Sequence, residues 1–401
     1  MSRSGAVGRP APWRDATRSL SAPLAVVDLD TFDINARDLI ARAGDTPVRL
    51  ATKSVRVRHL VHRALDVHGF SGVMAYSLAE ALWLAEDGIS DVLVGYPSVD
   101  TASLVALASN PAAREAITLM VDDVAQIALI ERALIRAGSP GGPAVQVCID
   151  VDASLRIAPL GVHLGVRRSP LRSPADAVAL ARAVERTGRV RVRGVMFYDA
   201  QVAGLGEAGL RGVGVRILKR ASLRELAGRR PAVVAALEDH LGRQLLVNAG
   251  GSGSVHDVAP DPTVTEVTAG SGLFCPTLFD DYSGFTARPA AFFGLDVVRR
   301  PAARIATAFG GGYAASGPPG KDRLPRAVDG SALLRSEGAG EVQTPLRYRR
   351  GHRVPAIGSR VWFRHAKAGE LLERFDAVHL VRGERVRETV PTYRGEGRNF
   401  G

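Results

Sequence analysis

The chain has 401 residues, of which 46% are hydrophobic, and a formal net charge of +11. It contains no stretch of about 18 uncharged apolar residues, so we expect no membrane-spanning helix, and its N-terminus lacks the apolar segment of a secretion signal. The basic residues are spread over helices and loops without stacking aromatics beside them. We therefore interpret the charge as a solvated surface and expect no nucleic-acid partner.

The two cysteines, Cys148 and Cys275, are too few for a disulfide framework. Free thiols persist in reducing compartments, so we expect a cytoplasmic protein. Burial in apolar surroundings is the ordinary state of such a cysteine.

Residues 1–19 are expected to form a loose N-terminal arm. Between residues 20 and 287, short β-branched runs alternate with helical patterns such as 77–87, 124–137 and 174–186. Eight strands alternating with helices indicate an α/β protein with a parallel sheet, and eight is the number that closes a TIM-type (β/α)8 barrel. An open doubly wound sheet is the alternative. The expected strands are residues 48–52, 72–75, 91–94, 117–121, 144–151, 192–197, 245–248 and 265–268.

The pattern changes after about residue 288. Helical periods nearly vanish, and turns rich in glycine and proline separate short alternating runs. Residues 361–364, 377–382 and 385–390 are typical of antiparallel strands. We therefore expect a second, mostly β domain over residues 288–401.

Lys53 follows the first expected barrel strand, VRLAT, at the end that carries the catalytic groups in barrels of this type. A lysine there is placed to act as an amine nucleophile. The alternative is a lysine that ends a strand and reaches solvent.

Two glycine- and serine-rich loops follow the last two expected barrel strands: NAGGSGS at 248–254 and AGSG at 269–272. Glycine lets the backbone approach a phosphate, and amide N–H groups and serine hydroxyls donate to it. Barrel phosphate sites are frequently built from these two loops. Together with Lys53, they favour a phosphate-bearing cofactor.

The segment PLAVVDLDTFDINARDL, followed by VRLATKS, resembles the opening of the fold-type-III pyridoxal-phosphate (PLP) enzymes. These are alanine racemase and, more closely, the D-threonine aldolase and D-serine dehydratase group. The likeness continues through DVDASLR, GVMFYDAQ, NAGGSGS and TEVTAGSGLFCPTLFDDY, and ends in SRVWFRHAKAGELLERFDAVHLVRGERV. It implies an alanine-racemase-type PLP-binding barrel over 20–287 and a D-serine dehydratase-like β domain over 288–401.

The resemblance also implies roles for individual residues. Lys53 would hold PLP as a Schiff base, Tyr198 would lie against the cofactor with Gln201 nearby, and Arg156 would reach the ring oxygen or the substrate carboxylate. Core packing with a satisfied hydroxyl is the alternative for Tyr198 and for Tyr282, which matches a tyrosine after the last strand. The phosphate would be held by Gly251, Ser252, Gly253, Ser254, Ser271 and Gly272.

The sequence departs from the resemblance at His365-Ala366-Lys367. In the aldolase and dehydratase group, a His-x-Cys or His-x-Asp pair binds a divalent metal that grips the substrate's β-hydroxyl. A protonated lysine cannot ligate a metal, so either the metal is lost, Lys367 is neutral, or a carboxylate such as Glu370 substitutes. We expect no metal, with Lys367 as its electrostatic substitute or as an acid for the departing hydroxyl. His365 would be its proton-transfer partner or merely a packed histidine, and Cys275 could lie near the cofactor.

The resemblance leaves two reactions open. The first is a PLP-dependent lyase reaction on a small β-hydroxy amino acid, by retro-aldol cleavage or dehydration, and the resemblance implies a substrate of D configuration. The second is racemisation, which needs Lys53 and a second acid–base group; a tyrosine of the partner subunit plays this part in alanine racemase, and Tyr313 is a candidate. A PLP-binding regulatory protein is a third class, disfavoured by the β domain. Family members place the site at a dimer interface, so we expect a homodimer.

Overall fold

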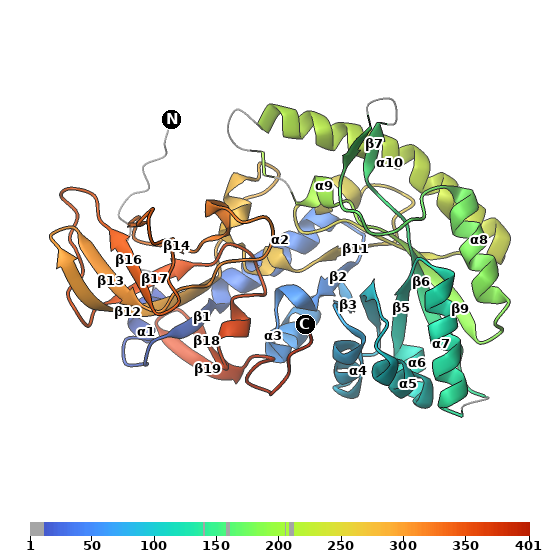
Figure 1. The fold of residues 1–401 in the computed structure, drawn as a ribbon, viewed down its shortest axis with the longest axis horizontal. Coiled ribbons are helices and arrows are strands. Elements are labelled where there is room, and N and C mark those ends of the chain that lie inside the picture. Colours follow the sequence, from blue (N-terminus) through green and yellow to red (C-terminus); the bar gives the residue numbers. More distant parts are fainter. Residues whose placement is uncertain (1–11, 139–140, 158–160, 205, 208–211) are drawn as a thin grey trace.

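The computed structural model describes residues 12–138, 141–157, 161–204, 206–207 and 212–401. Within them, the chain forms a closed eight-stranded parallel barrel and a nine-stranded, mostly antiparallel sheet beside it. Figure 1 shows the barrel with its surrounding helices on one side and the sheet on the other.

The barrel consists of the eight segments expected from the sequence. Its strands follow one another in chain order, and β11 pairs with β2 to close the ring, which excludes the open doubly wound sheet. The strands are β2 (Val48–Ala51), β3 (Phe70–Ala75), β4 (Val92–Pro97), β5 (Ile117–Val121), β6 (Val145–Asp150), β9 (Val190–Phe197), β10 (Leu246–Ala249) and β11 (Glu266–Ala269).

Most of the helices connect these strands, and several begin at a side chain that caps free backbone N–H groups. The capping boxes of Asp123 with Gln126 and of Ser173 with Asp176 fix the starts of α7 and α8. None of the described helices is both long and apolar enough to cross a membrane. The helices are α1 (Pro12–Ala16), α2 (Leu29–Ala43), α3 (Arg58–Leu65), α4 (Leu78–Glu86), α5 (Thr101–Ser109), α6 (Pro111–Ala116), α7 (Val124–Arg136), α8 (Pro174–Glu185), α9 (Ala200–Ala203), α10 (Gly212–Leu241) and α11 (Val255–Val258).

The second part of the chain is the expected β structure, and it includes the three strand segments predicted there. One further strand, β1 (Leu24–Asp28), comes from the range expected to belong to the barrel; it pairs antiparallel with β12 and parallel with β18. A separate hairpin consists of β7 (Leu155–Ile157) and β8 (Val162–Leu164). The other sheet strands are β12 (Ala291–Ala302), β13 (Ile305–Phe309), β14 (Arg326–Ala327), β15 (Ala332–Leu333), β16 (Gln343–Arg347), β17 (Arg360–Arg364), β18 (Ala377–Arg382) and β19 (Arg385–Pro391).

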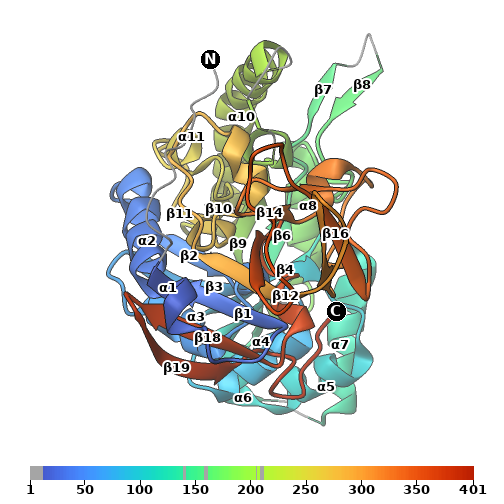
Figure 2. The same cartoon turned by 90° about the vertical axis from the view of Figure 1, so that its left-hand side faces the viewer.

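The expectation of a loose N-terminal arm is wrong for residues 12–16, which form α1. Trp13 is only 3% exposed because it stacks on Phe292 and meets Trp362 edge-on. Figure 2, which faces the sheet, shows α1 beside β1 and β18. The rest of the expected arm, residues 1–11, lies outside the described residues.

The interior of the barrel has two different layers. Near the middle, a small apolar cluster contains Leu93, Met120, Cys148 and Met196. At the amino-terminal end, the buried Arg49 guanidinium is held between Glu266 and Asp91, at 2.6 and 2.9 Å. These layers fill the interior of the barrel, and active sites of such barrels lie at the carboxyl-terminal ends of the strands.

Candidate active site

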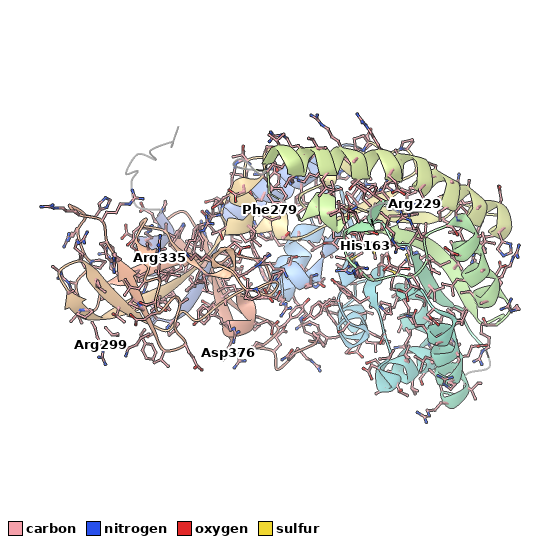
Figure 3. The ribbon with its side chains drawn as sticks, turned by 45° about the horizontal axis from the view of Figure 1, so that its top comes forward. His163, Arg229, Phe279, Arg299, Arg335 and Asp376 are labelled. Atoms are coloured by element: carbon pink, nitrogen blue, oxygen red, sulfur yellow. The ribbon has the colours of Figure 1, made fainter. Side chains whose placement is uncertain are left out.

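A cavity of about 350 Å³ lies at the carboxyl-terminal ends of the barrel strands. Its walls come from the end of β4, from the loops after β2, β9, β10 and β11, and from the segment after β8. The β13–β14 connection and the segment after β17 complete them. Phe279, which lines it, is labelled in Figure 3 between the barrel and the sheet. Both parts of the molecule therefore contribute to the cavity.

Lys53 lines this cavity just after β2, and its Nζ donates a hydrogen bond of 2.7 Å to the hydroxyl of Tyr96. Burial would raise the pKa of Tyr96, but the charge and hydrogen bond of Lys53 and the charges of Arg168 and Lys367 outweigh it, so the pKa is lowered. A Cβ on Gly369 would lie 1.9 Å from the carbonyl oxygen of Lys53. Only glycine lets the segment after β17 pack this closely on the lysine.

The two glycine- and serine-rich loops meet on one wall of the cavity. Gly251, Ser252, Gly253 and Ser271 line it. The Ser252 hydroxyl accepts hydrogen bonds of 3.0 Å from the N–H groups of Gly270 and Gly272, which joins the loops.

Two residues of the expected phosphate set lie behind this wall. Neither Ser254 nor Gly272 is among the residues lining the cavity in the described chain. Ser254 accepts a hydrogen bond from the N–H of Gly251, and Gly272 packs against Leu39. Both support the wall from behind.

Tyr198 and Tyr282 also line the cavity. The hydroxyl of Tyr282 donates to the carbonyl of Ala203 at 2.8 Å, and burial raises the pKa of both tyrosines. Both phenols are therefore neutral at physiological pH, and their rings form part of the cavity wall.

The structure does not bring Arg156 or Gln201 into the cavity. Arg156 lies on the β7–β8 hairpin and pairs with Asp152 at 2.7 Å. Gln201 is buried, and its amide donates to the carbonyl of Ala153 at 2.7 Å. In the described chain neither residue is among those lining the cavity, and each instead holds the segment after β6.

A different arginine, Arg168, stands at the cavity. Its guanidinium lies 4.7 Å from the ring centre of Tyr198 and 5.3 Å from that of Tyr96. Sequence reasoning missed both Arg168 and Tyr96. Tyr96 had a usable signal, a polar residue at the exit of a predicted strand, whereas Arg168 lies in a loop without a motif.

Lys367 lines the cavity, and its Nζ donates to the hydroxyl of Ser316 at 2.7 Å. Burial lowers the pKa of Lys367, Glu370 opposes this shift, and Lys53 and Arg323 add to it. Ser316 and Arg323 also line the cavity, and both come from the glycine-rich connection that the sequence indicated only as turns.

His365 lies close in sequence but does not line this cavity. It is 3% exposed and packs edge-on against Phe274. Burial and Arg364 lower its pKa to about 3, so the ring is neutral. A backbone hydrogen bond with Ala291 opposes this lowering of the pKa.

The residues do not fit the divalent metal that the resemblance implies. An ammonium stands at the position of the second ligand, and Glu370 already accepts the backbone N–H of Ser316 at 2.9 Å. No group of three His, Cys, Asp or Glu side chains in the described part of the chain could hold a metal ion.

The residues do fit PLP. The cavity has a lysine amine on one side and glycine and serine donors on another, with aromatic walls between them. Four basic residues line it (Lys53, Arg168, Arg323 and Lys367), and no aspartate or glutamate in the described ranges does. This donor set suits an anionic, planar cofactor with an aldehyde.

Tyr313 and Cys275 lie outside the cavity wall. Tyr313 packs between Phe293 and Phe375, at 5.0 and 5.7 Å between ring centres. Cys275 is buried, and its Sγ lies 3.0 Å from the carbonyl oxygen of Gly272. Burial raises the pKa of this thiol to about 11.

A parallel barrel with a lysine after its first strand, joined to a β sheet, defines the alanine-racemase-type class of fold. Residues 27–277, more than half of the chain, match the family described as "Alanine racemase, N-terminal domain". The chain belongs to this family.

Among curated proteins, the chain is similar to a 3-hydroxy-D-aspartate aldolase of Paracoccus denitrificans, with 26% identity over 269 residues. The match covers 64% of this chain and 60% of the aldolase.

Solved structures share the fold over nearly the whole chain. D-threonine aldolase from Filomicrobium marinum has a TM-score of 0.78 at 22% identity, covering 93% of this chain and 95% of the aldolase. D-threo-3-hydroxyaspartate dehydratase from Delftia sp. HT23 has a TM-score of 0.72 at 21% identity, covering 94% and 99%.

Proposed function

We propose that the protein is a PLP-dependent lyase acting on a small β-hydroxy amino acid of D configuration. The observation that carries this is the cavity in which Lys53 meets two glycine- and serine-rich loops and no carboxylate from the described chain. The relatives named as aldolases and a dehydratase support the reaction class.

Lys53 would hold the cofactor as a Schiff base, and the wall of Gly251, Ser252, Gly253 and Ser271 would hold its phosphate. When bound, PLP supplies an electron sink for the bonds at the substrate's Cα. We assign Arg168 to the substrate carboxylate, which is one of the two alternatives, with the ring oxygen, that the resemblance gave to Arg156. A guanidinium matches a carboxylate bidentately, and this one is oriented by two aromatic rings.

The racemase alternative is less well supported. It needs a second acid–base group facing Lys53 across the substrate. Tyr313 was a candidate only as a residue of a partner subunit, and it packs among aromatic residues of its own protomer, whereas the relatives named as aldolases and a dehydratase support the lyase. We therefore favour the lyase reaction.

We also propose that the protein works in the cytoplasm as a homodimer. The two cysteines are free and buried, as expected in a reducing compartment. The dimer is an inference from the family alone.

A substrate screen tests the proposed function. Holoenzyme is incubated with the D and L forms of threonine, serine and 3-hydroxyaspartate, and the products are identified by mass spectrometry. We expect turnover of a D substrate to glycine with an aldehyde, or to a keto acid with ammonia. Racemisation without either product pair would overturn the lyase assignment.

A further inference from the structure

The cationic wall of the cavity includes two residues that the function above does not use. Lys53 is assigned to the cofactor and Arg168 to the carboxylate, which leaves Lys367 and Arg323. Lys367 occupies the second position of the metal pair that the resemblance implies. Its ammonium is a compact point charge with three donors.

Contacts from three segments fix the position of Lys367. Its Nζ donates to Ser316 at 2.7 Å, and the N–H of Ser316 donates to Glu370 at 2.9 Å. On the other side, the N–H of Leu278 donates to the carbonyl of Ala366 at 3.2 Å. With one donor on Ser316, the ammonium has two donors left for a ligand in the cavity.

His365 does not line the cavity at the barrel loops, although it and Lys367 both line a second cavity on the sheet side of the segment after β17. Its ring is almost completely buried and packs on Phe274. The expectation that His365 is the proton-transfer partner of Lys367 stays a prediction, and the role of Lys367 does not depend on it.

We propose that Lys367, positioned by Ser316, performs the task of the absent metal pair: it stabilises negative charge on the β-oxygen of the substrate. The enzyme would then be independent of divalent metal. This inference rests on the proposed function. No bond forms or breaks at the lysine; its ammonium donates a hydrogen bond that strengthens as charge develops on the oxygen.

Metal content is the first test. Holoenzyme is dialysed against EDTA, its zinc, manganese and magnesium are measured by elemental analysis, and turnover of the best β-hydroxy substrate is followed. We expect less than about a tenth of an equivalent of metal and unchanged turnover. Stoichiometric metal whose removal abolishes turnover would overturn the proposal.

Lys367→Met is the second test, with Lys321→Met as the matched control on the exposed part of the glycine-rich connection. We expect Lys367→Met to lower kcat by about 100-fold or more, with an unchanged PLP absorbance band. Ser316→Ala should lower kcat by about tenfold with little change in KM, and Ser316→Thr should restore it. An unchanged kcat in Lys367→Met would refute this proposal alone, whereas a parent that turns over no β-hydroxy amino acid would refute the proposed function.

Discussion

At the scale of single residues, the barrel places the amine of Lys53 within hydrogen-bond distance of the Tyr96 hydroxyl. Lys53 follows β2 and Tyr96 lies near the end of β4, and both strands are neighbours of β3. The parallel pairing of β2, β3 and β4 brings their side chains within hydrogen-bond reach, although 43 positions separate them in the chain. Lys53 was predictable because it follows a clear strand. Tyr96 was not predictable as its partner, because their contact depends on the register between the strands.

The phosphate wall can be tested by adding charge at Ser271. A carboxylate about 4 Å from a phosphate costs several kcal/mol even at an effective dielectric of 20. We therefore expect Ser271→Asp to weaken PLP binding by at least about tenfold, which corresponds to about 1.4 kcal/mol. Equilibrium dialysis of the apoprotein with PLP measures this.

Ser271→Asn is the matched control because it has nearly the same shape without the charge. It should bind PLP within about threefold of the parent, and both variants should unfold at the parent's urea midpoint. Equal affinity of the Asp and Asn variants would place the phosphate elsewhere. Gly253→Val is unsuitable for this test, since a Cβ there would lie 2.3 Å from the carbonyl oxygen of Ala203 and disturb the loop itself.

At the scale of elements, the strands of the barrel were predictable because their apolar runs are bounded by turn residues. All eight form within a few residues of their expected limits. The pairing of β1 was not predictable, since an apolar run such as Leu24–Asp28 fits a buried position in either the barrel or the sheet. Only its pairings with β12 and β18 in the folded structure show that β1 belongs to the sheet.

The buried ion pair between β2 and β11 gives a prediction on stability. Arg49 and Glu266 are 1% and 5% exposed, and the guanidinium meets the carboxylate at 2.6 and 2.8 Å. Glu266→Gln would leave the buried charge without its full partner, so we expect a loss of about 3–5 kcal/mol in the free energy of unfolding. Urea denaturation measures it.

The exposed pair of Arg394 and Asp376 is the control, since these side chains are 59% and 77% exposed. Asp376→Asn should cost no more than about 1 kcal/mol. Similar losses in Glu266→Gln and Asp376→Asn would mean that the interior pair does not stabilise the barrel. Asp376 is labelled on the sheet side of the molecule in Figure 3.

At the scale of the whole molecule, the cavity is formed by the barrel and the sheet part of the chain together. Ser316, Arg323 and Lys367 come from the sheet part of the chain and line the cavity opposite the barrel loops. The sequence indicated Lys367 through a departure from a motif. Ser316 and Arg323 were not predictable as site residues, because a turn-rich connection has no periodic pattern from which its path could be inferred.

The most direct test of the account is to find where the cofactor is attached. Apoprotein is reconstituted with PLP, reduced with borohydride, digested and mapped by mass spectrometry, with Lys53→Ala and Lys367→Ala treated in parallel. We expect the pyridoxyl group on Lys53 in the parent and in Lys367→Ala, because only Lys53 follows the first barrel strand opposite the two loops. Label on Lys367 in the parent, or no label on any lysine after reconstitution, would contradict the account.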